Sequence, residues 1–391
     1  MKNGEQHGNQ AAVLRQRAEK LFRDSFGEAP SVIARAPARV ELLGNHTDYN
    51  AGRVLSMAIN RCVYVAAGAC PGKTTEIVSS SFPRTVLIEA GGQPSGEDRW
   101  ANYVWGMHEM FRGEGYPVRP FRAVVHGTIP AGAGVSSSAA LEVAAGLALS
   151  ALGGFPVEPD KLALLAQKAE HRYCGTKCGL LDQFSTLFGK AGHALLIDFN
   201  TLTHRPIPVS DSDSVFAVCP SGAAHTLADS AYNDRRAECE EAVRILTGRN
   251  PRIRSLSDIS MEQLSARRET LGPLLFRRAA HVVGENARVD RGVEALAEGN
   301  MAAFGKLMYD SHRSSRENYE NSCPELDRLV EIARGVDGVR GARLTGGGFG
   351  GATLTLLDRR TTTAFEDAVR KNYTPSATVH IVSSANGACV E

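Results

Sequence analysis

The sequence lacks an excess of charge of either sign. Its 391 residues include 44 lysines and arginines and 43 aspartates and glutamates, which gives a formal net charge of +1. A protein this close to neutral has no long-range field that would collect nucleic acid or an anionic membrane surface. We therefore expect neither as a partner, and any phosphate group must be held by a local cluster of donors.

Long hydrophobic runs are also missing. No stretch reaches the roughly 18 consecutive apolar residues that a membrane-spanning helix needs. The first ten residues, MKNGEQHGNQ, are polar and do not resemble a secretory signal. We expect a cytoplasmic protein with no membrane partner.

The cysteines lack the dense spacing of a small disulfide scaffold. Eight are scattered along the chain, which favours reduced thiols. His171, Cys174 and Cys178 lie close enough in sequence to suggest metal ligands. Because no second Cys or His pair completes a set of four, we interpret them as ordinary loop or core residues.

What the chain does have is the length and composition of a folded protein with two domains. Apolar residues make up 43% and charged residues 22%, and 391 residues exceed the size at which a single core stops growing. The segment 201–214 is polar and rich in turn residues. We place the boundary there and predict an N-terminal domain over 1–205 and a C-terminal domain over 206–391. Helical and strand patterns mix in both halves, which predicts an α+β fold.

The strongest chemical signal is a glycine- and serine-rich loop between a strand and a helix. Residues 121–129 alternate as a strand does, PAGAGVSSSAA follows at 130–140, and a buried helix is expected to end at Gly153 or Gly154. This order brings backbone N–H groups and a helix N-terminus to one place, where a phosphate binds well. A serine-capped helix after a flexible turn is the alternative. The predicted phosphate-binding residues are Gly132, Gly134, Ser136, Ser137 and Ser138.

Two other glycine patterns compete for a nucleotide. CPGKTT at 70–75 resembles a P-loop, but strand-like residues follow it, so we predict a hairpin turn at Pro71 and Gly72. GGGFGG at 346–351 satisfies the dinucleotide pattern but precedes a strand late in the chain. We predict a tight glycine turn against a ligand or another backbone.

Two further segments combine polar side chains with short apolar runs. ARVELLGNHTDYNAG at 38–52 brings many hydrogen-bonding groups to one turn, which suits a polyol but is also typical of a solvated loop. CGLLDQFSTLFG at 178–189 places Asp182 at an expected helix start. That carboxylate could be a general base, or a charge favoured by the helix dipole.

Together these segments resemble the galactokinases, in the family that also includes homoserine, mevalonate and phosphomevalonate kinases. The signature GRVNLIGEHTDYNGG is similar to residues 38–52, and the pattern PxGxGLSSSA is similar to residues 130–139. The motif TGGGFGG is intact at 345–351. Galactokinase-like segments also follow in the same order, as WANYVWG at 100–106, LLDQ at 180–183, GHALLID at 192–198, AYNDRRAECEEA at 231–242 and SCPELD at 322–327.

The resemblance implies a two-lobed fold that binds ATP, Mg²⁺ and a sugar in the cleft between the lobes, and we expect a monomer. Asp182 would be the base or orienting carboxylate for the sugar C1 hydroxyl. Arg39 would stabilise the transferring phosphoryl group and keep that carboxylate ionised. The implied sugar contacts are Asn45, His46, Asp48, Gly179 and Tyr232. The implied nucleotide contacts are Trp100 near the adenine, Gly347 and the phosphate loop, and the implied magnesium ligands are Ser138 and Glu170.

One departure from the signature bears on the substrate. Asn45 stands where galactokinases usually carry glutamate, which looks placed to accept a hydrogen bond from the sugar 6-hydroxyl. Asparagine keeps an acceptor but removes the charge, so a substrate with a C6 carboxylate would no longer be repelled. Galactose is the expected substrate. Galacturonate, N-acetylgalactosamine, and a catalytically weak sensor of sugar and ATP are the alternatives.

Overall fold

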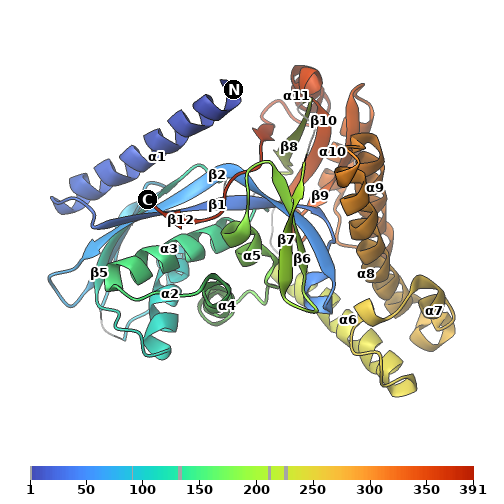
Figure 1. Ribbon diagram of the computed structural model, residues 1–391, viewed down its shortest axis with the longest axis horizontal. Helices are drawn as coiled ribbons and strands as arrows, with labels where there is room; N and C mark the ends of the chain where they lie inside the picture. The colour runs from blue at the N-terminus through green and yellow to red at the C-terminus, as the bar shows by residue number, and fades with distance from the viewer. Residues whose placement is uncertain (1, 90, 131–133, 210–212, 224–227) are drawn as a thin grey trace.

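The computed structural model of the chain describes residues 2–89, 91–130, 134–209, 213–223 and 228–391. Helices and strands alternate irregularly along both halves (Figure 1). The helices are α1 (Lys2–Phe26), α2 (Asn102–Gly113), α3 (Ser137–Gly153), α4 (Pro159–Ala169), α5 (Leu181–Phe188), α6 (Ala228–Arg249), α7 (Met261–Ser265), α8 (Arg268–Ala297), α9 (Met301–Ser314), α10 (Pro324–Arg334) and α11 (Thr362–Asn372). The strands are β1 (Val32–Leu43), β2 (Arg53–Ala69), β3 (Thr75–Ser79), β4 (Phe82–Ile88), β5 (Phe121–Gly127), β6 (His193–Asp198), β7 (Thr203–Pro208), β8 (Ser214–Pro220), β9 (Val339–Thr345), β10 (Ala352–Asp358), β11 (His380–Val382) and β12 (Cys389–Val390).

The larger sheet is covered by helices on both faces. Its strand order is β12-β1-β2-β5-β3-β4, and β6 pairs with both β2 and β7. Side chains alternate across a strand, so Val63 and Val65 on β2 join the core under α2, α3 and α4, whereas Tyr64 joins Phe22 of α1 on the other face. Figure 1 shows α1 on one side of this sheet and α2, α3 and α4 on the opposite side. Burial on both faces fixes the position of β1.

The smaller sheet belongs to the second half of the chain. Its order is β11-β8-β10-β9, and all its pairings are antiparallel. One face packs against α10 and α11 through Leu329 and Phe365. The other face contributes Leu354 and Leu356 to a core shared with Val40 of β1 and Phe304 of α9. This shared core joins the two lobes.

The division near residue 205 stays a prediction. β7 crosses that position and pairs with β6, and β12 returns at the end of the chain to pair with β1. The C-terminal half therefore contributes a strand to the sheet of the first half.

The predicted hairpin at Pro71 and Gly72 is wrong. β2 and β3 flank this loop, but β5 lies between them in the sheet and pairs with both. The sequence supplies the turn residues but does not show that a later strand inserts between their neighbours. The segment CPGKTT is not a P-loop, as predicted, because β3 and not a helix follows it.

Within the described residues, we find no helix that combines the length and the apolar character needed to cross a membrane.

Candidate functional site

The loop between β5 and α3, called the phosphate loop below because the sequence predicts phosphate binding there, stands where the sequence places it. Ser136 takes a left-handed conformation, with φ of 59°, directly before α3, and its Oγ donates a hydrogen bond to Oδ2 of Asp182 at 2.5 Å. Backbone strain of this kind in a serine is typical of functional sites. Ser137 and Ser138 open the helix, where N–H groups and the helix dipole favour an anion. Gly132 lies in 131–133, outside the described residues.

A second glycine segment faces this loop. The turn of TGGGFGG joins the antiparallel strands β9 and β10, which excludes the dinucleotide-binding context. A Cβ at Gly346 would lie 2.8 Å from the carbonyl oxygen of Gly134, and one at Gly348 would lie 2.1 Å from that of Asn321. The prediction of a tight turn against another backbone is confirmed.

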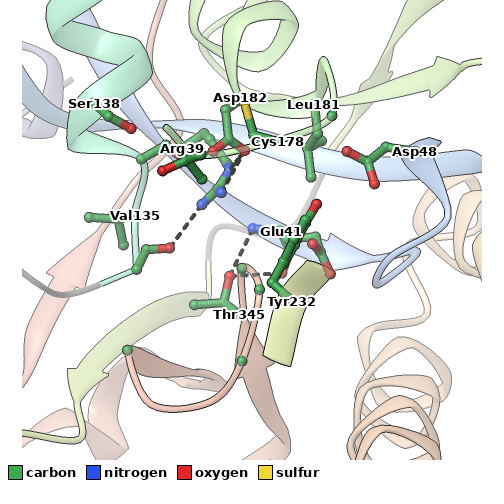
Figure 2. A pocket seen from close by; sticks show the side chains of 18 of the residues that line it. Arg39, Glu41, Asp48, Val135, Ser138, Cys178, Leu181, Asp182, Tyr232 and Thr345 are labelled. Carbon is green, nitrogen blue, oxygen red and sulfur yellow. Dashed lines mark hydrogen bonds and ion pairs between the residues drawn. The ribbon is translucent and has the colours of Figure 1, made fainter. Parts of the chain in front are cut away.

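Arg39 and Asp182 form the charged centre between β1 and α5. The Nε of Arg39 donates to Oδ1 of Asp182 at 2.7 Å, and its Nη2 lies 2.6 Å from the same oxygen (Figure 2). A third donor, Nη1, bonds the carbonyl oxygen of Gly134 at 3.0 Å. The side chain of Arg39 is 5% exposed and that of Asp182 is 21% exposed, so the carboxylate is the more accessible partner. The guanidinium therefore ties the carboxylate to the phosphate loop.

His46 is held by hydrogen bonds at both of its ring nitrogens. Its Nε2 donates to the carbonyl oxygen of Gly347 at 2.8 Å, so Nδ1 accepts from the hydroxyl of Tyr49 at 2.6 Å. Burial lowers the pKa of His46 to about 3. Its ring lies 5.1 Å from the ring of Tyr232, measured between centroids. The imidazole is therefore neutral and oriented beside that tyrosine.

Asp48 approaches the chain at Gly179. A Cβ at position 179 would lie 1.6 Å from Oδ2 of Asp48, so only glycine permits this contact. Burial raises the pKa of Asp48 to about 7, and the charges of Asp182 and Glu41 add to the rise. Asp48 and Gly179 both line the same cavity as Tyr232.

The side chain of Asn45 is fully enclosed. Its Nδ2 donates to Oε1 of Glu41 at 3.0 Å and to the carbonyl oxygen of Gly346 at 2.8 Å. Its Oδ1 accepts from Nδ2 of Asn321 at 2.8 Å and from Oγ of Ser315 at 3.3 Å. Both donor positions and both acceptor positions of the amide are used within the protein. Asn45 is therefore a poor candidate for direct contact with a sugar.

Glu41 is a residue that the motif comparison missed. It stands where the signature GRVNLIGEHTDYNGG carries asparagine, and this departure was the available signal. Its Oε1 lies 2.8 Å from Nη2 of Arg343, which is fully buried. Burial raises the pKa of Glu41, and the guanidiniums of Arg343 and Arg39 oppose that rise. Asn45 replaces the glutamate of the signature. A carboxylate is instead present on Glu41, which is hydrogen-bonded to Asn45.

Ser138 and Glu170 come together at the other side of Asp182. Both residues line the cavity, and Glu170 accepts from Sγ of Cys178 at 3.1 Å and from Nε2 of Gln183 at 3.2 Å. Burial raises the pKa of Glu170 to about 7, against the lowering by Cys178. Hydroxyl and carboxylate oxygens are the ligands that Mg²⁺ prefers, so this pair fits the ion.

These groups share one cavity of about 420 Å³. Figure 2 shows Arg39 and Asp182 in contact, with Ser138 to one side of this pair and Asp48 to the other. Basic, acidic and hydroxyl side chains thus surround a space in which a phosphoryl group can meet a polyol. The cavity is lined by Arg39, Glu41, Asn45, His46, Asp48, Tyr103, Gly134, Val135, Ser136, Ser137, Ser138, Glu170, Thr176, Cys178, Gly179, Leu181, Asp182, Tyr232, Thr345, Gly346, Gly347, Gly348, Phe349, Gly350 and Gly351.

Trp100 does not line this cavity in the part of the chain that the structure describes. Its ring stacks on Phe82, with centroids 4.9 Å apart and planes 7° apart. Tyr103, one turn further along, does line the cavity, although the sequence comparison did not select it. A role for Trp100 near an adenine stays a prediction.

Comparisons with known proteins place these features in a class. Residues 102–190 match the family profile of the N-terminal domain of GHMP kinases, and residues 293–374 match that of the C-terminal domain. Residues 20–69 match the galactokinase galactose-binding signature. Mevalonate kinase of Methanococcus jannaschii has a TM-score of 0.66 at 20% identity, over 90% of this chain and 98% of that chain, which supports the shared fold.

Closer relatives define the family. The galactokinase of Roseiflexus sp. is 40% identical over 94% of both chains, and that of Homo sapiens is 41% identical over 97% of both chains. The crystal structure of Lactococcus lactis galactokinase complexed with galactose has a TM-score of 0.90 at 34% identity, over 96% of this chain and 99% of that chain. This chain belongs to the galactokinase family. The predicted family, the α+β two-lobed fold and the assignment as a sugar kinase are confirmed.

Proposed function

We propose that this chain transfers the terminal phosphoryl group of ATP to the C1 hydroxyl of galactose, giving galactose 1-phosphate and ADP. The observation that carries the proposal is the contact between Arg39 and Asp182 inside the shared cavity. Ser136 and Gly134 connect this pair to the phosphate loop. The family relationship supports galactose as the acceptor.

In the proposed mechanism, Asp182 takes the proton of the C1 hydroxyl as the hydroxyl oxygen bonds to the terminal phosphorus of ATP, and the bond from that phosphorus to the bridging oxygen of ADP breaks. Arg39 holds the carboxylate in place and neutralises charge on the transferring group. Positioning and charge neutralisation are the main requirements of phosphoryl transfer, because it needs little covalent chemistry from the protein. Asp48 and Tyr232 would bind other sugar hydroxyls. The neutral His46, whose two ring nitrogens both bond within the protein, would pack beside Tyr232.

Ser138 and Glu170 would hold Mg²⁺. When bound there, the ion would supply positive charge to the phosphate oxygens of ATP. The fit rests on the oxygen donors of this pair and on Glu142, whose Oε1 has no partner among the described residues and which faces Gln183. A monomeric state and a cytoplasmic location stay predictions.

Substrates altered at C6 find less support. The charge missing at Asn45 is present at Glu41, which lines the cavity. A uronic acid would bring a second carboxylate beside that of Glu41, which is ion-paired with Arg343, and like charges in a confined site repel.

The test is a coupled assay of ADP release by the purified chain with ATP and Mg²⁺. The acceptors are galactose, galacturonate, N-acetylgalactosamine and mevalonate. We expect galactose to give the highest kcat/KM, with phosphate on C1 of the product. Galactose binding without turnover would favour a sensor, and a preference for galacturonate would overturn the substrate.

A further inference from the structure

Two positions in the segment 38–52 exchange residue types relative to the galactokinase signature. GRVNLIGEHTDYNGG carries asparagine at the fourth position and glutamate at the eighth. This chain carries glutamate at the fourth position, Glu41, and asparagine at the eighth, Asn45. The segment therefore keeps one carboxyl group and one amide, in reversed order.

The structure brings the two exchanged residues into contact. Nδ2 of Asn45 lies 3.0 Å from Oε1 of Glu41, and both residues are almost completely buried. In either order an amide and a carboxylate are hydrogen-bonded to each other, so the exchange preserves this contact. It moves the negative charge from position 45 to position 41. The opposite charge is supplied by the fully buried Arg343, at 2.8 Å from Oε1.

Only one of the two side chains can still bind a ligand. All four hydrogen-bonding positions of the Asn45 amide are used by the protein. The hydrogen bonds to the side chain of Glu41 fall on Oε1. Its Oε2 has no hydrogen-bond partner among the described residues and is not one of their enclosed, unpartnered atoms. Since Glu41 also lines the cavity, that oxygen remains available to it.

Glu41 contacts Asn45 and its charge acts on Asp48, two of the predicted sugar contacts. Glu41 also lines the same cavity as Tyr232. Asp182, which also acts on Asp48, is engaged by Arg39 and Ser136. In the proposed function Asp182 serves the C1 hydroxyl, so Oε2 of Glu41 can take a different hydroxyl group of the same ligand.

We propose that Glu41 is a specificity-determining residue whose Oε2 accepts a hydrogen bond from a galactose hydroxyl other than that on C1. Asn45 holds Glu41 in position and does not contact the sugar. This inference rests on the proposed function, because it assigns one recognition contact in the same site.

The experiment compares galactose with 2-, 3-, 4- and 6-deoxygalactose, in the wild type and in the variant Glu41→Asp. Aspartate keeps the charge opposite Arg343 but withdraws the carboxylate by one methylene. We expect kcat/KM for galactose to fall about 10- to 100-fold, mainly through KM, as for a lost hydrogen bond to a charged group. The penalty for removing one particular hydroxyl, large in the wild type, should shrink to near onefold in the variant.

Three results would overturn the inference or the function beneath it. Unchanged kinetics in Glu41→Asp would remove Glu41 from recognition. A uniform loss, with all four deoxy penalties intact, would leave it a structural role only. Wild-type protein that binds galactose by calorimetry but never phosphorylates it would refute the proposed function alone. The inference about Glu41 would then be tested by measuring the binding affinity of each sugar in the panel.

An exchange of the pair gives a second test if Glu41→Asp fails to fold. Glu41→Asn removes the carboxylate, and Asn45→Glu places two carboxylates side by side, so each alone should lower kcat/KM for galactose. The double variant restores one carboxylate and one amide and should exceed both single variants. A double variant no better than the weaker single one would overturn the proposal. Glu298→Asp, at an exposed position on the far end of α8, is the matched control and should behave as wild type.

Discussion

Arg39 and Asp182 are 143 residues apart in the sequence, yet two nitrogens of the guanidinium lie within 2.7 Å of one carboxylate oxygen. The second carboxylate oxygen is bound by Ser136 from the phosphate loop. The carboxylate is therefore fixed from two sides before any substrate arrives, and preorganisation of this kind lowers the barrier to a reaction that depends on positioning.

Removing the charge of Asp182 should abolish most turnover. In Asp182→Asn we expect kcat to fall about 10²- to 10⁴-fold, the usual contribution of a positioned base. ATP affinity should stay within about threefold, because the carboxylate serves the transfer step. ADP release and nucleotide titration measure the two effects. Ser136→Ala, which leaves Arg39 in contact with the carboxylate, is the milder comparison, and near-normal kcat in Asp182→Asn would remove the carboxylate from the mechanism.

Adding a methyl group at position 179 should damage sugar binding. The Cβ of Gly179→Ala would overlap Oδ2 of Asp48 at 1.6 Å, so the carboxylate must move. We expect KM for galactose to rise at least about tenfold, the scale of one lost charged hydrogen bond. Gly72→Ala adds the same methyl group in the exposed CPGKTT loop, where the nearest atom beyond the neighbouring residues is Sγ of Cys70 at 3.8 Å. It should change neither the KM for galactose nor the KM for ATP. A loss of ATP binding in Gly72→Ala would revive the P-loop interpretation.

The buried carboxyl of Asp48 should make stability depend on pH. Its pKa is raised to about 7 in the folded protein, above the value of an unfolded aspartate near 4. Between these values the folded state binds more protons than the unfolded state, so this group's contribution to the free energy of unfolding falls as pH rises and levels off above about 7. Asp48 retains some solvent contact, and we expect a change on the order of 2 kcal/mol.

Denaturant unfolding at pH 5 and pH 8 measures this contribution, with Asp48→Asn as the reference. The variant should lose less stability between the two pH values than the wild type does. Equal losses in both proteins would show that Asp48 does not titrate in this range.

Ser138 should determine the magnesium requirement. In Ser138→Ala we expect the Mg²⁺ concentration for half-maximal turnover to rise about 10-fold at fixed ATP, a typical effect of a missing oxygen ligand or its support. Ser137→Ala, at the neighbouring position, should have a smaller effect. An unchanged magnesium curve in Ser138→Ala, read from initial rates, would move the ion away from α3.

The sequence predicted the local features of the site well. The glycine–serine loop, the start of α3 and the glycine turn between β9 and β10 depend on residues that are neighbours in the chain, so their patterns are visible in it. The family resemblance then selected Arg39 and Asp182, whose contact no local pattern could show.

What the sequence could not show depends on contacts between distant segments. The amide of Asn45 is saturated by Glu41, Gly346, Ser315 and Asn321, and three of these four lie some 270 or more residues away. From the motif alone Asn45 resembled a sugar ligand, because its partners could not be seen. The position of β5 between β2 and β3 is hidden for the same reason, since strand order is a tertiary property.

The pairing of β12 with β1 has a consequence for folding during synthesis. Residues 389 and 390 complete one edge of a sheet whose other strands are synthesised much earlier. During translation, that edge of β1 keeps its hydrogen-bonding groups open until β12 has been made and has left the ribosome, and open edges recruit strands from other chains. Nascent chains that stall before Cys389 should therefore aggregate more readily than chains that include β12.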